Sequence, residues 1–307
     1  MSYKFIRTFG TSYTEGGGFH YWIDKRIKTL YKGLSPMIDN TMFEFSWPSF
    51  LQKKVKPKVI NHALSGYGND RIFREVYKVV ESDDFKSSEH LFLFELSALG
   101  REEFYSNEIG DWGIINYQVN WDNTLPIKNG FGMAFNYHNQ NNTRKSIKEA
   151  KKEDRWIDEN IEIFEQYILK TISVDNQLQT LIRKLKMFFS YCDASNLNWY
   201  IVADECMFIS RPELRKWINK FLGDKDYIGI FQYAGEDITE ETNECVVDGH
   251  FGIYANQTIG LYLAKKLNEI GEIDELLEYN TLDKDYVKDT ILKNAKNLKG
   301  NFEKDLI

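Results

Sequence analysis

The sequence predicts an α/β layered fold with a mostly parallel sheet. Short apolar runs rich in β-forming residues alternate along the chain with longer segments of helical periodicity. The run at residues 90–96 is apolar almost throughout, as is typical of a strand that helices cover on both faces. Alternation of this kind indicates strands that pair in parallel and are joined by helical connections.

Five short runs predict the strands of this sheet. They lie at residues 5–9, 58–61, 90–96, 199–203 and 227–231. Helices are predicted where apolar residues recur at helical spacing, which they do at residues 70–80, 177–191 and 256–267. The clearest apolar stripe, in the second of these helices, consists of Leu178, Leu181, Ile182, Leu185, Phe188 and Phe189.

Two stretches interrupt the alternation. Residues 106–146 are rich in Asn, Gly, Trp and Tyr and have little periodicity, and at about forty residues they exceed an ordinary connection. Residues 144–171 then follow a helical pattern. We interpret residues 106–171 as an insertion at the C-terminal edge of the sheet, for which a lid is one interpretation. From about residue 277 onward the sequence predicts a peripheral helix and tail.

Composition restricts the class of protein. The chain has 307 residues, is 42% hydrophobic and 28% charged, and can therefore bury one large core or two modest ones. A net charge of -7 and a sequence pI near 5.4 disfavour nucleic-acid binding, which usually needs a basic face. Cys192, Cys206 and Cys245 are odd in number and widely spaced, which disfavours a disulfide framework or a structural zinc site.

The sequence signals of membrane-spanning and secreted proteins are also missing. No apolar run reaches the ~18–20 residues that span a bilayer. Residues 1–8 contain neither the apolar stretch nor the cleavage site of a signal peptide. We therefore expect a cytoplasmic protein with reduced cysteines and without membrane or nucleic-acid partners.

Ligands of open parallel sheets bind at the loops that follow the strands, and the first such loop holds a serine. Ser12 lies just after the strand at residues 5–9, between Gly10 and the glycines at 16–18. Such a serine could act as a nucleophile, with backbone N–H groups of the loop close to a developing oxyanion. The alternative is a flexible turn with an ordinary serine. No phosphate-binding glycine motif fits these residues.

A second loop, just before the last helix, combines a carboxylate with a histidine. His250 could act as a general base, and Asp248 could orient it and stabilise its charged form. The alternative is an Asp-Gly turn with an incidental histidine. No further ligand motif completes a metal site here. The remaining four histidines are expected to be structural: His20, His62, His90 and His138.

A third loop runs from a strand through glycines into a helix. The backbone N–H of Gly66 could donate a hydrogen bond into a site above the sheet, although loop glycines are also routine turn formers. Asn69 or Asp70 could cap the N-terminus of the helix that follows.

In chain order these three loops resemble the SGNH/GDSL hydrolase superfamily. Gly10-Thr11-Ser12 matches its G-D-S block, with Thr in place of Asp, and Gly66 matches the loop glycine of its oxyanion hole. Residues 46–51 and 59–72 resemble the W-P-x-x-L and N-x-A-x-x-G-x-S-N-x-R-I segments of many members. Asp248 and His250 match the last block. The resemblance covers about residues 3 to 268 and implies a three-layer α/β/α sandwich with a flavodoxin-like five-stranded sheet.

Two blocks depart from the family pattern. The last block is D-x-H rather than D-x-x-H, so Asp204, after the fourth strand, is a second candidate for the carboxylate. The third block lacks the asparagine whose side chain donates to the oxyanion. Ser97 lies nearest to its place and could donate one hydrogen bond instead, while Arg101 could supply charge or pair with Glu102 or Glu103. Loss of one oxyanion donor typically lowers turnover by ~10²–10³-fold.

The resemblance implies a serine esterase or deacylase that needs no metal and no organic cofactor. Its catalytic residues would be Ser12, His250 and Asp248, and its oxyanion and substrate-binding residues Gly66, Ser97, Asn69 and Arg101. The substrate would be a small-molecule or glycan acyl ester. Two alternatives stay open: a carbohydrate O-acyltransferase with the same triad, and a binding protein that has lost catalysis.

The order of the motifs also bears on domain organisation. Because Ser12 and His250 come from opposite ends of the chain and must meet over one sheet, we expect a single domain over residues 1–307. The insertion at 106–171 and the tail are surplus to the roughly 200 residues that such a core needs, and substrate choice is expected to lie there.

Overall fold

The computed structural model divides into two compact units. The described residues are 3–15, 45–64, 66–97, 100–116, 132–135, 147–171, 174–204 and 253–279. Unit 1 consists of Met1–Thr8, Ser12–Asn61 and Gly229–Ile307, and unit 2 of Phe9–Thr11 and His62–Ile228. A division into compact units does not by itself define domains, so the single domain over residues 1–307 stays a prediction.

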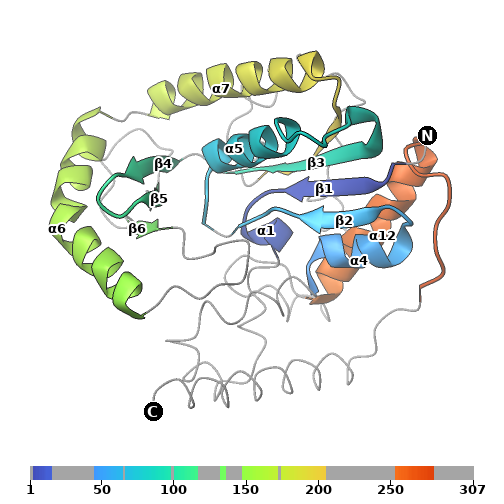
Figure 1. Ribbon diagram of the computed structural model, residues 1–307, viewed down its shortest axis with the longest axis horizontal. Helices are drawn as coiled ribbons and strands as arrows, with labels where there is room; N and C mark the ends of the chain where they lie inside the picture. The colour runs from blue at the N-terminus through green and yellow to red at the C-terminus, as the bar shows by residue number, and fades with distance from the viewer. Residues whose placement is uncertain are drawn as a thin grey trace, which may run out of the picture. The chain divides into compact units, whose positions relative to one another are not determined.

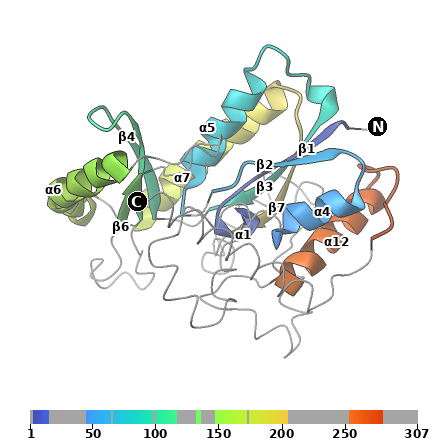
Figure 2. The same ribbon diagram turned by 60° about the horizontal axis from the view of Figure 1, so that its bottom comes forward.

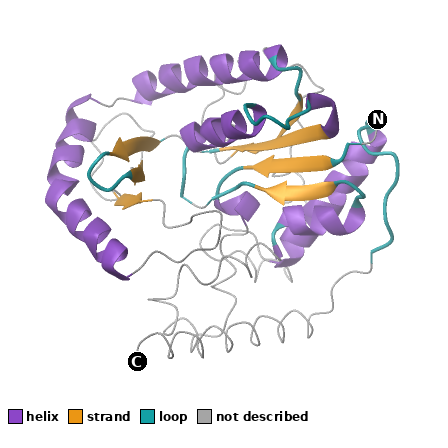
Figure 3. Cartoon of the chain, viewed as in Figure 1, coloured by secondary structure: helices purple, strands orange, loops and turns teal. Residues whose placement is uncertain are grey.

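The main sheet confirms the α/β class and its mostly parallel pairing (Figures 1 and 3). Its strands are β1 (Phe5–Phe9), β2 (Lys58–Asn61), β3 (His90–Leu96) and β7 (Asn198–Asp204). They follow the order β2-β1-β3-β7, and the pairs β1–β2 and β3–β7 are both parallel. Each agrees with a predicted strand to within a residue at either end. The fifth candidate, residues 227–231, lies outside the described residues.

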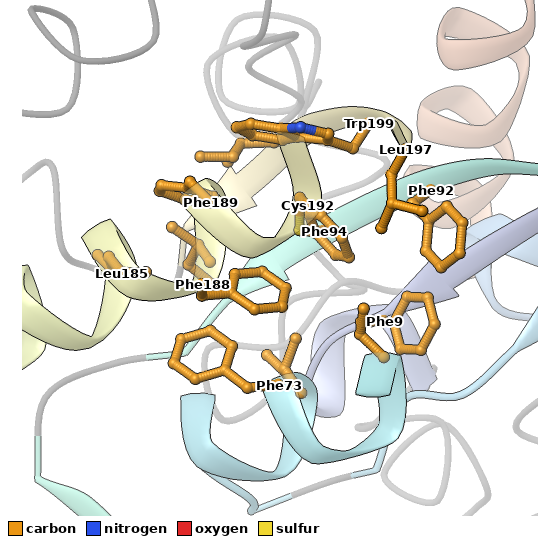
Figure 4. Packing of buried hydrophobic residues seen from close by; sticks show 14 of the residues in the cluster. Phe9, Phe73, Phe92, Phe94, Leu185, Phe188, Phe189, Cys192, Leu197 and Trp199 are labelled. Atoms are coloured by element: carbon orange, nitrogen blue, oxygen red, sulfur yellow. The ribbon is translucent and has the colours of Figure 1, made fainter. Parts of the chain in front are cut away.

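An aromatic core holds two helices against β3 and β7 in unit 2 (Figure 4). The helices are α5 (Asn69–Val80) and α7 (Val174–Ala194), which confirms the helices predicted at 70–80 and 177–191. Alternate residues of β3, namely Phe92, Phe94 and Leu96, point into this core because side chains alternate along a strand. The α7 residue Phe189 stacks on Trp199 of β7 with ring centroids 4.7 Å apart.

A buried thiol also belongs to this core. Cys192 on α7 is free and buried, and its burial raises the pKa of the thiol. A thiol of this kind behaves as a small hydrophobic group in a core. Cys206 and Cys245 lie outside the described residues.

Unit 1 contains two helices that touch along their backbones, α4 (Trp47–Lys54) and α12 (Ile253–Glu269) (Figure 2). A Cβ added at Gly260 of α12 would lie 2.7 Å from the carbonyl oxygen of Trp47, so only glycine fits there. The side chain of Asn256 accepts a hydrogen bond from the Trp47 N–H at 3.0 Å. The helix predicted at 256–267 is therefore confirmed, whereas α4 follows no periodicity that we recognised.

The predicted insertion contains a second, antiparallel sheet in unit 2. Its strands are β4 (Arg101–Ser106), β5 (Asp111–Asn116) and β6 (Gly132–Phe135), in the order β4-β5-β6. The sheet begins before the predicted boundary at residue 106, and β5 and β6 are regular structure that the weak periodicity of residues 106–146 did not reveal.

Helix α6 (Ile147–Thr171) runs beside this sheet in Figures 1 and 2 and confirms the helical pattern of the insertion. The ring of Phe104 on β4 packs on Trp156 and Phe164 of α6, at centroid distances of 5.7 and 4.8 Å. On the neighbouring strand Gly113 faces the same ring, and an added Cβ there would lie 2.3 Å from it. Three half-buried aromatic rings therefore pack α6 against this sheet.

The start of the C-terminal tail is docked within unit 1. Leu276 forms an antiparallel bridge with Val55, and the Leu277 N–H donates to the Lys54 carbonyl at 2.8 Å. Residues after 279 lie outside the described part of the chain. Within the described residues, no helix combines the length and the apolar character needed to cross a bilayer.

Candidate active site

Ser12 begins a short helical turn, α1 (Ser12–Glu15), directly after β1, Gly10 and Thr11. The serine is 6% exposed, so it is held within the protein rather than on an open turn. The sequence predicted this position after the strand, and the role of Ser12 as a nucleophile stays a prediction.

Asn61, the last residue of β2, fastens the turn that contains Ser12. Its amide group donates to the Thr14 carbonyl at 2.9 Å, and its side-chain oxygen accepts from the Thr8 hydroxyl at 3.0 Å. One side chain therefore joins the end of β2, the end of β1 and the turn α1. Asparagine suits this place because its amide donates and accepts at once.

Thr11 is bound to a buried carboxylate that the sequence prediction missed. Its N–H donates to Oε2 of Glu95 at 3.1 Å, and its hydroxyl donates to Oε1 of the same residue. Both side chains are fully buried. The available signal was a carboxylate inside an otherwise apolar strand, since Glu95 is the only charged residue of β3.

The loop with Gly66 is held from several directions within unit 2. Gly66 has φ +82°, a left-handed conformation that favours glycine. The Leu64 N–H donates to the Gly10 carbonyl at 3.2 Å, and Arg71 donates to the His62 carbonyl at 2.8 Å. Within the described ranges no acceptor is paired with the Gly66 N–H. The role of this N–H as an oxyanion donor stays a prediction.

Asn69 and Ser97 form a reciprocal buried pair. The Asn69 amide donates to the Ser97 carbonyl at 3.0 Å and accepts from the Ser97 N–H at 2.9 Å, as a neighbouring strand would. The expected cap by Asn69 or Asp70 is wrong: Gly68 occupies the cap position and no side chain caps the helix. Asn69 is turned toward β3 instead, since the two buried groups of Ser97 need partners.

The Ser97 hydroxyl is engaged by the loop and by β4. It donates to the Tyr67 carbonyl at 3.0 Å and accepts from Arg101 at 3.2 Å. A hydroxyl has one hydrogen to donate, so in this arrangement Ser97 holds the Gly66 loop rather than pointing its hydrogen at a substrate. Arg101 in turn orients Ser97.

A cluster of charged side chains joins α5 to β4. Arg74 forms a two-point ion pair with Glu103, whose side chain is 1% exposed. Burial nevertheless raises the pKa of Glu103 to about 7, because desolvation outweighs the attraction of Arg74 and Arg71. Glu102, on the opposite side of the strand, accepts from Gln177 at 2.6 Å.

Two of the predicted catalytic residues, Asp248 and His250, lie outside the described residues. Asp204, the second candidate for the carboxylate, is the last residue of β7. His62 and His90 have the structural roles expected of them: His62 stacks on Phe9 at 4.6 Å, and His90 is buried beside Phe85.

Comparison with known proteins found a similar solved structure but no similar sequence. No family model matches the chain, and no curated protein sequence matches it. A solved structure of a proposed lipolytic protein of the G-D-S-L family from Desulfitobacterium hafniense is 10% identical, with a TM-score of 0.43. The alignment covers 85% of this chain and 98% of that one.

The polar groups of the described site come from strand ends and from the loops that follow them. Within the described residues, no group of three or more His, Cys, Asp or Glu side chains could hold a metal ion. What the structure does provide is a hydroxyl at a strand end, a loop N–H in a left-handed turn and buried bonds that fix both loops.

Proposed function

We propose that the protein is a serine hydrolase of carboxylic esters. The observation that carries the proposal is the placement of Ser12, which begins a helical turn directly after β1 and follows a threonine anchored in the core. A fixed hydroxyl at a strand end can attack a carbonyl in a defined direction. The turn of Gly66, with its N–H available among the described residues, adds support as an oxyanion donor.

The reaction would run through an acyl-enzyme. His250 takes the proton of the Ser12 hydroxyl as the oxygen attacks the carbonyl carbon, and the carbonyl electron pair moves onto oxygen. The N–H groups of Ser12 and Gly66 would hold this oxyanion, and Asp248 would stabilise the charged imidazole. Collapse expels the alcohol, which leaves with the proton from His250. Water then repeats the sequence, releasing the acid and restoring Ser12.

The preferred substrates are acyl esters of carbohydrates. The second sheet supplies aromatic side chains next to charged ones: Tyr105 is 51% exposed, and its ring meets Trp112 at 5.5 Å. Arg74 lies over the Trp112 ring at 4.2 Å. Aromatic faces beside hydrogen-bonding groups suit sugar rings.

The proposal is tested by covalent labelling. A fluorophosphonate probe should modify wild-type protein at Ser12, and hydrolysis of short p-nitrophenyl esters should disappear in Ser12→Ala. Loss of the nucleophile in a triad typically lowers turnover by about 10⁶-fold. His250→Ala should slow labelling similarly, and Ser2→Ala is the matched control. Equal hydrolysis by wild type and Ser12→Ala would refute Ser12 as the nucleophile.

A catalytically inactive binding protein is the second candidate. The observation in its favour is the Ser97 hydroxyl, whose hydrogen is donated to Tyr67, so the third oxyanion donor is not supplied there. Absence of labelling in folded wild-type protein, together with binding of acylated glycans, would favour this candidate. An acyltransferase would instead label at Ser12 and pass the acyl group to an added glycan acceptor.

A further inference from the structure

We propose that Glu95 is a positioning residue for the nucleophile and acts on Ser12 through Thr11. This inference rests on the proposed function, because it assigns Ser12 the nucleophilic role. It adds a residue of the third strand to which the sequence analysis gave no role.

The first argument is the pair of hydrogen bonds between the two residues. Glu95 accepts the Thr11 N–H with one carboxylate oxygen, at 3.1 Å, and the Thr11 hydroxyl with the other. Together these bonds fix both the backbone and the side chain of Thr11. The next peptide bond leads to Ser12, so the direction of the Ser12 backbone depends on how Thr11 is held.

The second argument is the cost of placing a carboxylate here. All seven residues of β3 are buried, and Glu95 itself is 0% exposed. Burying a carboxylate costs several kcal/mol unless hydrogen bonds compensate for the lost water. A leucine would complete this apolar strand without that cost. The carboxylate is therefore explained by what it holds, and Thr11 supplies two donors to it.

The third argument is an irregularity of the sheet at this residue. Phe94 pairs with Ile201 and Glu95 with Ala203, so the register shifts between Phe94 and Glu95 and Val202 is the extra residue. Bulges of this kind often redirect a side chain beside an active site. Phe94 and Leu96 face the aromatic core, which leaves Glu95 on the other face of β3.

The matched pair Thr11→Val and Thr11→Ser tests the role of the Thr11 hydroxyl. Valine has the shape of threonine but no hydroxyl, whereas serine keeps the hydroxyl and loses the methyl group. For inactivation by a fluorophosphonate we expect Thr11→Val to lower the maximal rate by about 10- to 100-fold, the range that a small misplacement of a reacting group produces. The probe concentration at half-maximal rate should be unchanged. Thr11→Ser should stay within about 3-fold of wild type, by the same reasoning.

A donor–acceptor exchange tests the partnership with Glu95. Thr11→Asp alone places two carboxylates in contact and should slow labelling at least as much as Thr11→Val. Adding Glu95→Gln should restore much of the rate, because the introduced amide would donate to the new carboxylate and its oxygen would accept the backbone N–H. A merely structural loss would not be reversed by a second substitution in the core.

The outcomes separate the two proposals. Wild-type labelling at Ser12 with an unchanged rate in Thr11→Val, or no recovery in the double variant, would overturn the role of Glu95 alone. No labelling of wild type would overturn the proposed function and this inference with it. If Thr11→Val does not fold, hydrogen exchange of residues 9–15 in the wild-type protein tests whether the Thr11 amide is bound to Glu95. Slow exchange of the Thr11 amide supports the bond, and exchange at the rate of an open loop overturns it.

Discussion

Asn69 shows how much a single buried side chain contributes to the site. It satisfies both backbone groups of Ser97, and an alanine in its place would leave those two groups buried without partners. Each unsatisfied buried group costs about 1–3 kcal/mol, so for two groups we expect Asn69→Ala to lower the free energy of unfolding by about 2–6 kcal/mol. Urea denaturation measures this difference.

The control for Asn69→Ala is Gln179→Ala, which removes an exposed amide from α7. A surface substitution of this kind is expected to change stability by at most about 0.5 kcal/mol. A loss in Asn69→Ala as small as in this control would show that the pair with Ser97 contributes little.

At the residue scale the sequence predicted positions better than partners. Ser12 and Gly66 were predicted because strand ends and glycine loops can be recognised along the chain. The bonds of Thr11 with Glu95 and of Asn69 with Ser97 join residues far apart in sequence. Those pairs depend on which strands are neighbours and in what register, and a linear pattern does not contain that information. Ser97 was accordingly given a chemical role, whereas the structure gives its hydroxyl a bond to Tyr67.

The same distinction holds for whole elements. The four described strands of the main sheet were predicted to within one residue, and the long amphipathic helices to within three residues, at either end. Helix α4 was missed because it is eight residues long and begins with Trp47 and Pro48, too short for a periodic stripe. Strand β5 was missed because Ile114 and Ile115 are both buried. Consecutive residues of a strand point to opposite faces, so two adjacent buried residues break the polar–apolar alternation by which a half-exposed strand is recognised.

Helices α4 and α12 lead to a prediction at the element scale. A Cβ at position 260 would lie 2.6 Å from the Phe50 Cβ and 2.9 Å from the Leu51 nitrogen, and backbone atoms cannot move aside cheaply. Alanine favours a helix over glycine by about 1 kcal/mol, but overpacking costs about 1–3 kcal/mol, so Gly260→Ala should lower the thermal midpoint.

Lys265→Ala provides the control on the same helix, because Lys265 is exposed. It should leave the thermal midpoint nearly unchanged, since surface substitutions usually fall within about 0.5 kcal/mol. A midpoint in Gly260→Ala equal to or above that of wild type would contradict the close contact between α4 and α12.

For the molecule as a whole, the cluster around Glu103 should make stability depend on pH. Among the described charged residues near α5, Glu103 faces Arg74, Arg71 and Asp70. Burial has the largest effect on its pKa and disfavours the charged form, as Asp70 also does, whereas Arg74 and Arg71 favour that form. The pKa of Glu103 is therefore about 7 in the folded protein, against an ordinary 4.5 in the unfolded chain.

The sign of this effect follows from proton binding. Between pH 4.5 and about 7 the folded protein holds the proton on Glu103 and the unfolded chain does not, so stability is lost as pH rises through this interval. The shift corresponds to at most about 3 kcal/mol.

The variant Glu103→Gln tests this dependence, because a glutamine at this position cannot ionise. The thermal midpoint of this variant should fall less than that of wild type between pH 5 and 8. Glu108→Gln, an exposed carboxylate of the same sheet region, should follow wild type. Parallel curves of thermal midpoint against pH for wild type and Glu103→Gln would contradict this prediction. They would show that Arg74 and Arg71 compensate fully for the burial of an ionised Glu103.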